Sequence, residues 1–486
     1  MRAVIDDGAD DYRIVKAGGS SLALTGSSTW TGGISVNGGN LYFANEGNLG
    51  GANADVLLNG GYLYFTGSGN TTIDLSVGSG VTAGLDLASD KLYLGTNLTF
   101  TGTSTLYVRG SILRAAAGAK IHINGSTTFY NNRQHTSSGV SVPIVLNSND
   151  LTVTVGSFGS SRAIRVYGSI SGTGNLTGLG VHAGWPTGPY GANTFVGTYT
   201  SYGQTHVSGS NQGLTNVVVR YGDSHRKRLE LEASNALAPA SSTNPPVLRW
   251  TGGHSTFDMN GRAQTLGGLS STLGDVANMG ALTLNVGEGE SYTFTRPISG
   301  AGKLTKKGLG TQILSGTCSH SAGTDVQAGT LDVRATLSGI GAVTVSGRLA
   351  GTGTISGPVT VNSGGVLEPG PAGAVGTHTL AAGLTLSDGA ILDLQAGATT
   401  DLVRVTGGTF TGVDPGQRVF VRLSDSGEMV RGQPYVLIDW TEASASGVDA
   451  SDFRCTADSP VNGTFGIQGT QLTVTPLFPG GVLLVR

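Results

Sequence analysis

Charged residues are scarce in this chain of 486 residues: Asp, Glu, Lys and Arg together make up 12% of it, where about 25% is usual. The formal net charge is only -3, and no basic face is available for phosphate contacts, so we expect no nucleic-acid partner. One basic cluster, His225 to Arg228, is followed directly by Glu230 and Glu232 on an alternating leucine pattern. That pattern is typical of a solvated strand face.

Cysteine is nearly absent as well. Cys318 and Cys455 are the only two, too few for a disulfide scaffold and without the spacing of a metal site. A single bridge between them stays open for a chain outside the cell. The 8 histidines are scattered singly, without the i, i+4 pairs or cysteine partners that a zinc site uses. We therefore expect no metal and no cofactor.

Long hydrophobic runs are missing too. No run of about 18 apolar residues occurs, so we expect no transmembrane segment of the helical kind. Residues 1–16 contain no apolar stretch of signal-peptide type. We expect that a signal peptide is not present in this chain, either because it has been removed or because export follows another route.

Glycine, in contrast, is abundant, with 81 residues. Gly, Ser, Thr and Asn disfavour helix interiors, whereas the short alternating runs of Val, Thr, Ile, Leu and Tyr favour strands. The glycines do not fall at every third position, which excludes collagen. The composition predicts an all-β protein.

The strongest pattern is an internal repeat. Residues 16–43 and 306–333 align without a gap, with glycines at fixed turns and aliphatic residues at fixed inward positions. A shorter repeat relates Asn37–Phe43 to Asn59–Phe65, at a spacing of about one coil of a parallel β-helix. The identical pairs of the long repeat are Lys16/Lys306, Gly18/Gly308, Leu24/Leu314, Gly26/Gly316, Gly33/Gly323, Val36/Val326, Gly39/Gly329 and Leu41/Leu331.

A unit that cannot bury its own apolar face must stack on copies of itself, so the repeat predicts a right-handed parallel β-helix, a β-solenoid. We expect residues 1–15 to form an N-terminal strand or cap and residues 16–395 to form the β-helix, with loop excursions near 99–166 and 184–191. We expect residues 396–486 to form a C-terminal β cap domain, because glycine becomes rarer there, strands lengthen, and an open solenoid end needs cover. Short strands are expected at 21–24, 34–36, 41–43, 56–58 and 62–65.

The pattern Lys-x-Gly, Leu-x-Leu-x-Gly, Gly-Gly-x-x-Val-x-x-Gly-x-Leu at residues 16–41, with its copy at 306–331, resembles the autotransporter-associated β-strand repeat. Thr256–Leu269, Tyr292–Gly308 and Gly347–Gly370 resemble further phrases of that family. The resemblance covers most of residues 12–395. It implies a secreted or surface-exposed parallel β-helix that acts as an adhesin, stalk or matrix component and has no catalytic residues.

Autotransporters of this kind end in a membrane barrel, and the residues after Val474 do not supply the many amphipathic strands that a barrel needs. We therefore expect a passenger-type segment without a recognisable C-terminal barrel.

Aromatic residues recur at the same coil positions. Alternation sends Phe43 and Phe65 to the core and Tyr42 and Tyr64 to the outside. Stacked outside, these two tyrosines form a ladder that either stabilises the sheet or contacts a surface glycan. Tyr42 and Tyr64 are the only candidate binding residues that the sequence indicates.

Parallel β-helices also carry polysaccharide lyases and hydrolases, whose sites need several carboxylates on one face beside an Arg or Lys. The densest acidic group, Asp6, Asp7, Asp10 and Asp11, precedes the first clear coil and is typical of a solvated end. Asp393 and Asp401 fall in different coils without an evident partner base. Partial matches to an esterase block at Gly222–His225 and to a phosphate loop at Gly300–Lys303 lack the residues and the scaffold that each needs.

The sequence thus favours a non-enzymatic, extracellular structural or adhesive β-solenoid at the cell surface, as a rod or fibre subunit. We expect no catalytic residues. The expected partners are further copies of the chain, assembled into a filament or sheath, or a cell-surface glycan or protein. Two alternatives stay open: a polysaccharide-active enzyme with its site in the loops of residues 99–185, and a glycan-binding module that uses Tyr42 and Tyr64.

Overall fold

The computed structural model consists almost entirely of short strands and turns. The chain divides into two compact units, Met1–Asp258 and Met259–Arg486. Within the described residues the only helices are two 3-10 turns, η1 (Glu46–Leu49) and η2 (Ala450–Asp452). The structure describes residues 11–51, 54–132, 137–155, 163–180, 193–209, 211–220, 228–371, 373–430 and 432–477.

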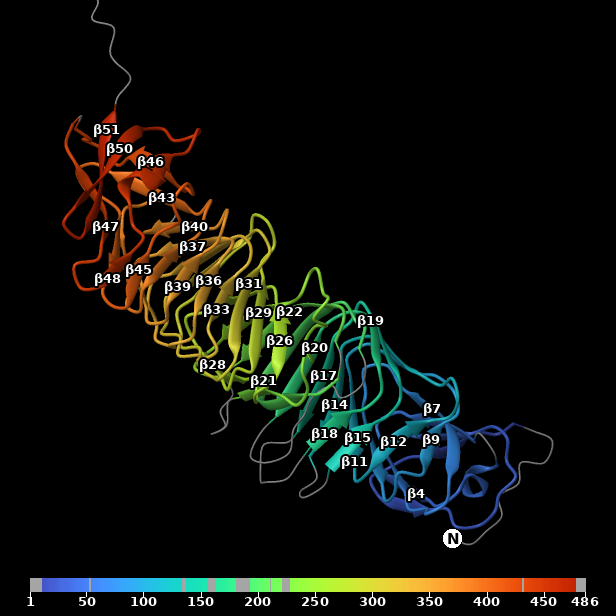
Figure 1. Ribbon diagram of the computed structural model, residues 1–486. Helices are drawn as coiled ribbons and strands as arrows, with labels where there is room; N and C mark the ends of the chain where they lie inside the picture. The colour runs from blue at the N-terminus through green and yellow to red at the C-terminus, as the bar shows by residue number, and fades with distance from the viewer. Residues whose placement is uncertain are drawn as a thin grey trace, which may run out of the picture. The chain divides into compact units, whose positions relative to one another are not determined.

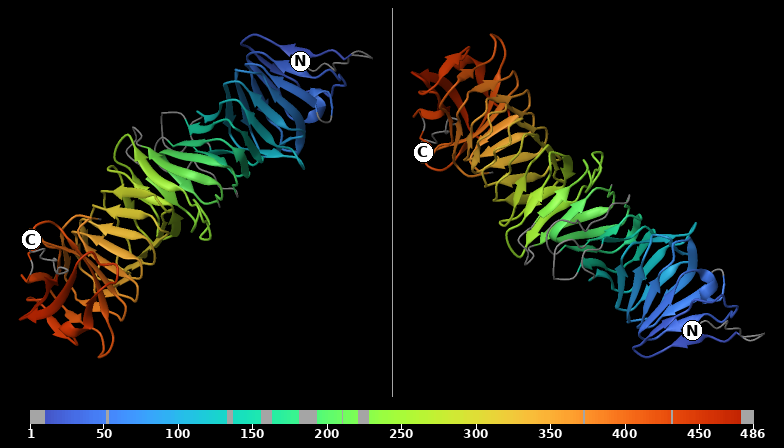
Figure 2. Two further views of the ribbon diagram at one scale, coloured as in Figure 1. Left: turned by 90° about the horizontal axis from the view of Figure 1, so that it is seen from above. Right: turned by 90° about the horizontal axis from the view of Figure 1, so that it is seen from below.

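In the first unit, strands one coil apart in the sequence lie side by side and parallel (Figures 1 and 2). Ile14 pairs with Ile34, and Ile34 pairs with Val56, so each turn of the chain adds one strand to the same sheet. The first such sheet contains β1 (Ile14–Lys16), β3 (Ile34–Val36), β5 (Ala54–Leu58), β7 (Thr71–Val77), β9 (Leu92–Leu94), β12 (Ile112–Ala115), β15 (Ser137–Val140) and β18 (Ala163–Val166).

Two further faces of the same coils are built in the same way. The second sheet contains β2 (Ser21–Ala23), β4 (Asn40–Phe43), β6 (Tyr62–Phe65), β8 (Thr82–Leu87), β11 (Ser104–Arg109), β14 (Thr127–Asn131), β17 (Leu151–Val155), β20 (Leu176–Gly180), β21 (Gly197–Val207), β22 (Leu214–Arg220) and β24 (Val247–Thr251). The third contains β10 (Leu98–Thr101), β13 (Ile121–Asn124), β16 (Ile144–Asn147) and β19 (Ile170–Thr173), and β21 also pairs with β23 (Arg228–Leu231), which pairs with β25 (Thr256–Asp258).

The second unit repeats this plan with three parallel stacks. One contains β26 (Ala263–Leu266), β29 (Ala281–Asn285), β31 (Lys303–Lys307), β33 (Thr324–Val326), β36 (Val343–Val345), β39 (Val359–Val361), β42 (Leu384–Leu386), β45 (Thr409–Thr411) and β48 (Ser444–Ser446). Another contains β30 (Ser291–Phe294), β32 (Thr311–Leu314), β34 (Thr330–Val333), β37 (Arg348–Gly351), β40 (Val366–Pro369), β43 (Ile391–Ala396), β46 (Val419–Asp425) and β49 (Phe453–Cys455). The last contains β35 (Thr336–Leu337), β38 (Thr354–Ile355), β41 (Thr377–Leu380), β44 (Leu402–Val405), β47 (Tyr435–Asp439), β51 (Gln471–Leu477) and β50 (Asn462–Gln468); β27 (Gly268–Ser270) and β28 (Asp275–Ala277) complete the unit.

The core of each unit is made of aliphatic rows that point inward from these strands. Leu24 and Val36, two of the repeated aliphatic positions, are 8% and 0% exposed. Because parallel neighbours stay in register, each buried residue lies on the equivalent residue of the next coil. The parallel β-solenoid predicted from the repeat is therefore confirmed.

Regular coils continue through most of residues 99–166, where the sequence predicts loop excursions. Leu98 pairs with Ile121 and Ile121 with Ile144, so β10, β13 and β16 stack without interruption. The polar residues of this range occupy outward positions while the alternate aliphatic residues remain buried, which weakens the repeat in the sequence without breaking the fold. Residues 133–136, 156–162 and 184–191 lie outside the described residues.

Parallel stacking also extends beyond residue 396, into the range that the sequence assigns to a C-terminal cap. Val421 of β46 pairs in parallel with Cys455 of β49, two strands that are 34 positions apart in register, whereas Leu304 pairs with Thr324 only 20 positions further on. The connections between strands are longer in this range, so the sequence does not show the regular spacing of the earlier coils. The antiparallel part is confined to β47, β51 and β50, which end this stack.

The repeated lysine has a structural role at a coil corner. The Nζ of Lys306 donates to the carbonyl oxygens of Lys307, Gly308 and Ala328, at 2.7, 2.9 and 3.2 Å. Lys16 makes the same set of contacts 290 residues earlier, at 2.9, 3.0 and 2.8 Å. Lys306 is fully buried, and burial lowers its pKa to about 8. The side chain joins one coil to the next through carbonyl groups at the corner, and the carbonyl oxygen of Lys307 also accepts from the backbone N of Val286 at 3.1 Å.

We expect Lys306→Met to lower the free energy of unfolding by about 3 kcal/mol, because it keeps the volume of the side chain but removes the ammonium donor from the carbonyl oxygens of Gly308 and Ala328. Lys307→Met is the matched control, since Lys307 is exposed at the neighbouring position. Urea denaturation of both variants beside the parent measures the difference. Equal midpoints for the two variants would contradict this role.

Two histidines are enclosed in the second unit. His378 of β41 is fully buried, and neither of its ring nitrogens has a hydrogen-bond partner among the described residues. Burial lowers its pKa to about 4. His320 is also buried, donates to or accepts from Thr324 Oγ1 at 2.8 Å, and has its pKa lowered by burial to about 4. Asp401 affects the pH dependence of stability in the opposite direction, because burial raises its pKa to about 6.

A histidine whose pKa is depressed by folding contributes stability above its unfolded pKa of about 6.5, and that stability is lost as the pH falls toward 4. Asp401 acts in the opposite sense, since its raised pKa favours the folded state at low pH. The free energy of unfolding of the parent should therefore fall between pH 7.5 and pH 4.5. We expect this fall to be about 2.5 kcal/mol smaller in His378→Leu. Urea titrations at the two pH values measure it, with Thr379→Val as a control that changes no titratable group. An unchanged acid response would show that His378 is not held neutral.

Candidate carbohydrate-contact surface

Tyr42 and Tyr64 lie next to each other on the outside of β4 and β6. Their rings stack with centroids 4.5 Å apart and planes inclined by 20°. On the inner side of the same strands, Phe43 and Phe65 are each 1% exposed, with ring centroids 5.4 Å apart. The predicted inward and outward alternation is present, and contact of Tyr42 and Tyr64 with a glycan remains a prediction.

Three further tyrosines occupy a parallel column on the same outer surface. Tyr62 of β6 and Tyr107 of β11 have ring centroids 5.7 Å apart, and Tyr107 and Tyr130 of β14 have centroids 5.0 Å apart. Gly84 of β8 stands between Tyr62 and Tyr107 in the register. A Cβ atom at Gly84 would collide with the ring of Tyr62, so the glycine lets the two tyrosines meet across one intervening strand.

Arg109, the last residue of β11, lies over two of these rings. Its guanidinium carbon is 4.8 Å from the centroid of Tyr62 and 4.7 Å from that of Tyr107. Both distances fit cation–π contacts. We call the outer surface formed by these partly exposed side chains the tyrosine face, and it consists of Tyr42, Tyr62, Tyr64, Tyr107, Tyr130 and Arg109.

The tyrosine face offers flat apolar rings with polar edges. Burial, and then the neighbouring Tyr62 and Tyr130, raise the pKa of Tyr107. Like an ordinary tyrosine, Tyr107 is neutral at physiological pH and has a proton to donate. Rings that stack on apolar faces while their hydroxyls donate hydrogen bonds are suited to sugar rings, which have the same two kinds of surface.

The sequence pointed to Tyr42 and Tyr64 but missed the second column. Gly84 interrupts that column, so Tyr62 and Tyr107 do not fall in consecutive coils. The signal that was available is the equivalence of Tyr107 and Tyr130, which are direct partners in the register of β11 and β14.

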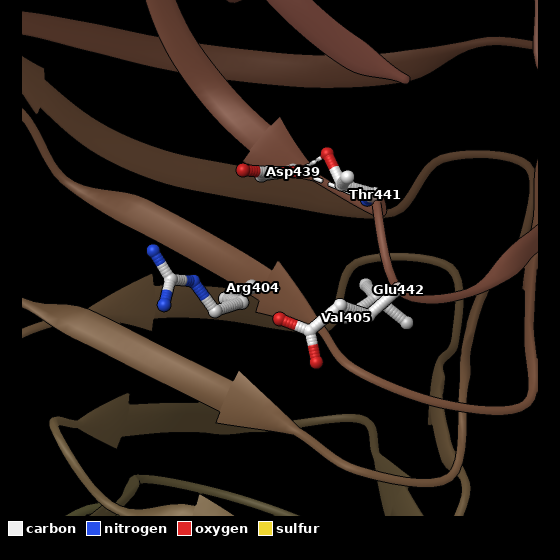
Figure 3. A pocket seen from close by; sticks show the side chains of 5 residues that line it. All are labelled: Arg404, Val405, Asp439, Thr441 and Glu442. Atoms are coloured by element: carbon white, nitrogen blue, oxygen red, sulfur yellow. Dashed lines mark hydrogen bonds between the residues drawn. The ribbon is translucent and has the colours of Figure 1, made fainter.

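Apart from the tyrosine face, a hollow lies in the C-terminal part of the second unit. It has a volume of about 200 Å³ and is lined by Arg404, Val405, Asp439, Thr441 and Glu442 (Figure 3). The carboxylate of Asp439 accepts hydrogen bonds from the backbone N and the Oγ1 of Thr441, at 2.9 and 2.6 Å. Burial opposes its ionisation, but these bonds, Gln471 and the charge of Arg404 outweigh burial and lower its pKa. The hollow can hold a small polar molecule, and its best-placed carboxylate is ionised rather than ready to donate a proton.

Asp393 has partners that the sequence did not reveal. The guanidinium of Arg348 forms ion pairs with the carboxylates of Asp393, at 2.8 Å, and Glu368, at 2.6 Å. The guanidinium of Arg422 also pairs with Asp393, at 3.3 Å. Asp401 does not join this network by an ion pair; its two oxygens accept hydrogen bonds from the backbone N of Gly376 and Gln395, at 2.7 and 2.8 Å. The arginines therefore engage the two carboxylates next to each other, and Asp401 is bound to backbone.

The remaining candidates from the sequence resolve as follows. Asp6, Asp7, Asp10 and Gly222–His225 lie outside the described residues, and Asp11 accepts a hydrogen bond from Thr31 Oγ1 at 2.5 Å. Gly300–Lys303 is a coil corner that leads into β31. Both cysteines are free thiols, so the bridge that the sequence left open does not form.

Within the described ranges, no three His, Cys, Asp or Glu side chains gather into a group that could hold a metal ion. In the same ranges, no helix combines the length and the apolar character that crossing a membrane requires.

Comparison with known proteins agrees with this architecture. Residues 14–42 and 304–333 match the passenger-associated-transport-repeat family. The chain carries two of these repeats. They coincide with the two copies that are evident in the sequence, and the repeated lysines at the coil corners lie inside them, so the resemblance to the autotransporter-associated repeat is confirmed.

A relative in Brucella suis biovar 1 (strain 1330), the adhesin BmaC autotransporter, is 39% identical over 105 residues. The similar part makes up 19% of this chain and 3% of the relative, so the chain matches only a small piece of a much longer protein.

We expect Gly84→Ala to push the ring of Tyr62 away from Tyr107 and Arg109, because the added methyl group occupies the space of that ring. The near-ultraviolet circular dichroism of tyrosine should change, and the free energy of unfolding should fall by about 1–3 kcal/mol through overpacking. Gly69→Ala is the matched control, since a Cβ atom there meets no atom within 4 Å. Parent-like spectra for both variants would contradict the described packing.

Proposed function

We propose that this chain is a non-enzymatic, passenger-type β-solenoid exposed at the cell surface, and that it adheres through the tyrosine face to carbohydrate on a target surface. The similarity to an autotransporter adhesin supports a surface location and an adhesive role. The single observation that carries the carbohydrate assignment is the pair of adjacent tyrosine columns on one outer sheet surface, with Tyr42 stacked on Tyr64 at 4.5 Å.

A rigid stack suits this role. The rings are fixed by the register of the strands below them, so little side-chain entropy is lost when a sugar ring packs on them. Tyrosine also gives a large contact area with only two rotatable side-chain angles. Assembly of several chains into a filament or sheath stays a prediction from the sequence.

The test is binding of the purified chain to a glycan array, followed by adhesion of beads coated with it to glycan-bearing cells. We expect a Tyr42→Ala, Tyr64→Ala double variant to bind any recognised glycan about 5- to 150-fold more weakly, because each of the two stacked rings is worth about 0.5–1.5 kcal/mol. Tyr93→Ala is the matched control, since Tyr93 lies on β9, in a different sheet, and is similarly exposed.

Equal losses in the double variant and in Tyr93→Ala, or no glycan binding by the parent chain, would overturn the assignment. Release of new reducing ends or unsaturated products from a polysaccharide during the same incubations would favour the enzyme alternative instead.

A further inference from the structure

We propose that the tyrosine face selects acidic glycans, those that carry a carboxylate or a sulfate group, and that Arg109 is the residue that recognises the negative charge. This inference rests on the proposed function, because it assigns a ligand class to the same surface. It adds the second tyrosine column, Gly84 and Arg109 to the site.

The guanidinium of Arg109 forms no ion pair with a carboxylate of the described residues. Among the described residues it has no hydrogen-bond or ion-pair partner, and its Nε is buried without an acceptor. Other arginines of the first unit are neutralised: Arg114 contacts Asp90 at 2.5 Å, and Arg228 contacts Asp258 at 3.0 Å. Asp86 is the neighbour of Arg109 in the register but forms no ion pair with it. A guanidinium on an outer surface that forms no ion pair within the protein is suited to an anionic ligand.

The two rings beneath it hold the guanidinium in one place. Tyr62 and Tyr107 approach each other over Gly84, and Arg109 lies at nearly equal distances from both, 4.8 and 4.7 Å. Because the flat face of the guanidinium is taken up by the rings, its edge N–H groups are left to donate. Arginine donates in a fork that matches the two oxygens of a carboxylate or sulfate.

The neighbours decide from which side an anion can approach. Asp86 faces Arg109 directly in the register of β8 and β11 and is buried, so an anion is disfavoured on that side. The rings of Tyr62 and Tyr107 lie in the neighbouring column, with Tyr107 two residues before Arg109 on β11, and the hydroxyl of a tyrosine is a hydrogen-bond donor at physiological pH. We therefore place the anionic group over the second column, with the neutral part of the sugar toward Tyr42 and Tyr64.

The experiment uses an array of matched oligosaccharides that share one core: the neutral form, the form with a sialic or uronic acid, and the sulfated form. We expect an acidic member to bind at least about tenfold more tightly than its neutral counterpart, since a hydrogen bond to a charged group is worth about 1.5–3 kcal/mol. This preference should shrink when NaCl rises from 50 to 500 mM. Comparison of the carboxylated and sulfated arms shows which anionic group is preferred.

Arg109→Gln should lower the ratio of acidic to neutral binding to about one, and Arg109→Lys should retain part of that ratio. Arg114→Gln is the matched control, because it changes the net charge equally on a different sheet of the same unit. Urea midpoints check that each variant is folded. Gly84→Ala tests the same preference without a change of charge. It displaces Tyr62 from beneath Arg109 and should therefore weaken the preference for the acidic member.

Equal binding of neutral and acidic members, or an undiminished preference in Arg109→Gln, would overturn this inference. If the tyrosine double variant then still lost binding, the proposed function would stand without it. If no member of any pair bound, both would fall together.

Discussion

The structure depends on one constraint: a coil of this chain satisfies neither its backbone hydrogen bonds nor its apolar side chains by itself, and only the next coil in register completes both. Strands inside the stacks have parallel neighbours on both sides, and the inward residues form buried rows. A slip of one residue would turn a whole row of aliphatic side chains to solvent. The stacking therefore fixes the inward positions strictly and leaves the outward positions open to variation.

Where strands give way to corners, the ladder no longer pairs every carbonyl group, and buried polar side chains replace it. Lys16 and Lys306 do this with three carbonyl contacts each. Gln312 does it between coils: its side chain accepts from the backbone N of Leu269 at 2.9 Å and donates to the carbonyl oxygens of Leu269 and Tyr292 at 3.0 and 3.1 Å. A long polar side chain in such a protein is as much a part of the fold as the aliphatic rows, because an unpaired buried carbonyl is costly.

The sequence predicted what repeats at short range. The strands at Ile34–Val36 and Tyr62–Phe65 have the expected bounds, and the alternation of Phe43 and Tyr42 follows from the period of a strand. Features that depend on register across several coils were missed: the meeting of Tyr62 and Tyr107 needs Gly84 between them, and the partners of Asp393 come from other coils. The coils beyond residue 396 were missed for a related reason, since their longer connections remove the fixed spacing on which a repeat is recognised.

An outer surface of this fold is a natural place for weak, extended recognition. Adjacent strands place equivalent side chains at the strand spacing of about 4.8 Å, so a favourable residue in one coil can be repeated in the next without any change of the core. The stack of Tyr42 on Tyr64 is one case, and the Tyr107 and Tyr130 pair is another. Arg109 breaks that uniformity, because it adds a partly exposed positive charge next to the buried Asp86 of the neighbouring strand. In the proposed function, the repeated tyrosines would supply contact area to many sugars and the charge of Arg109 would distinguish among them. Both depend on the same register that holds the core together.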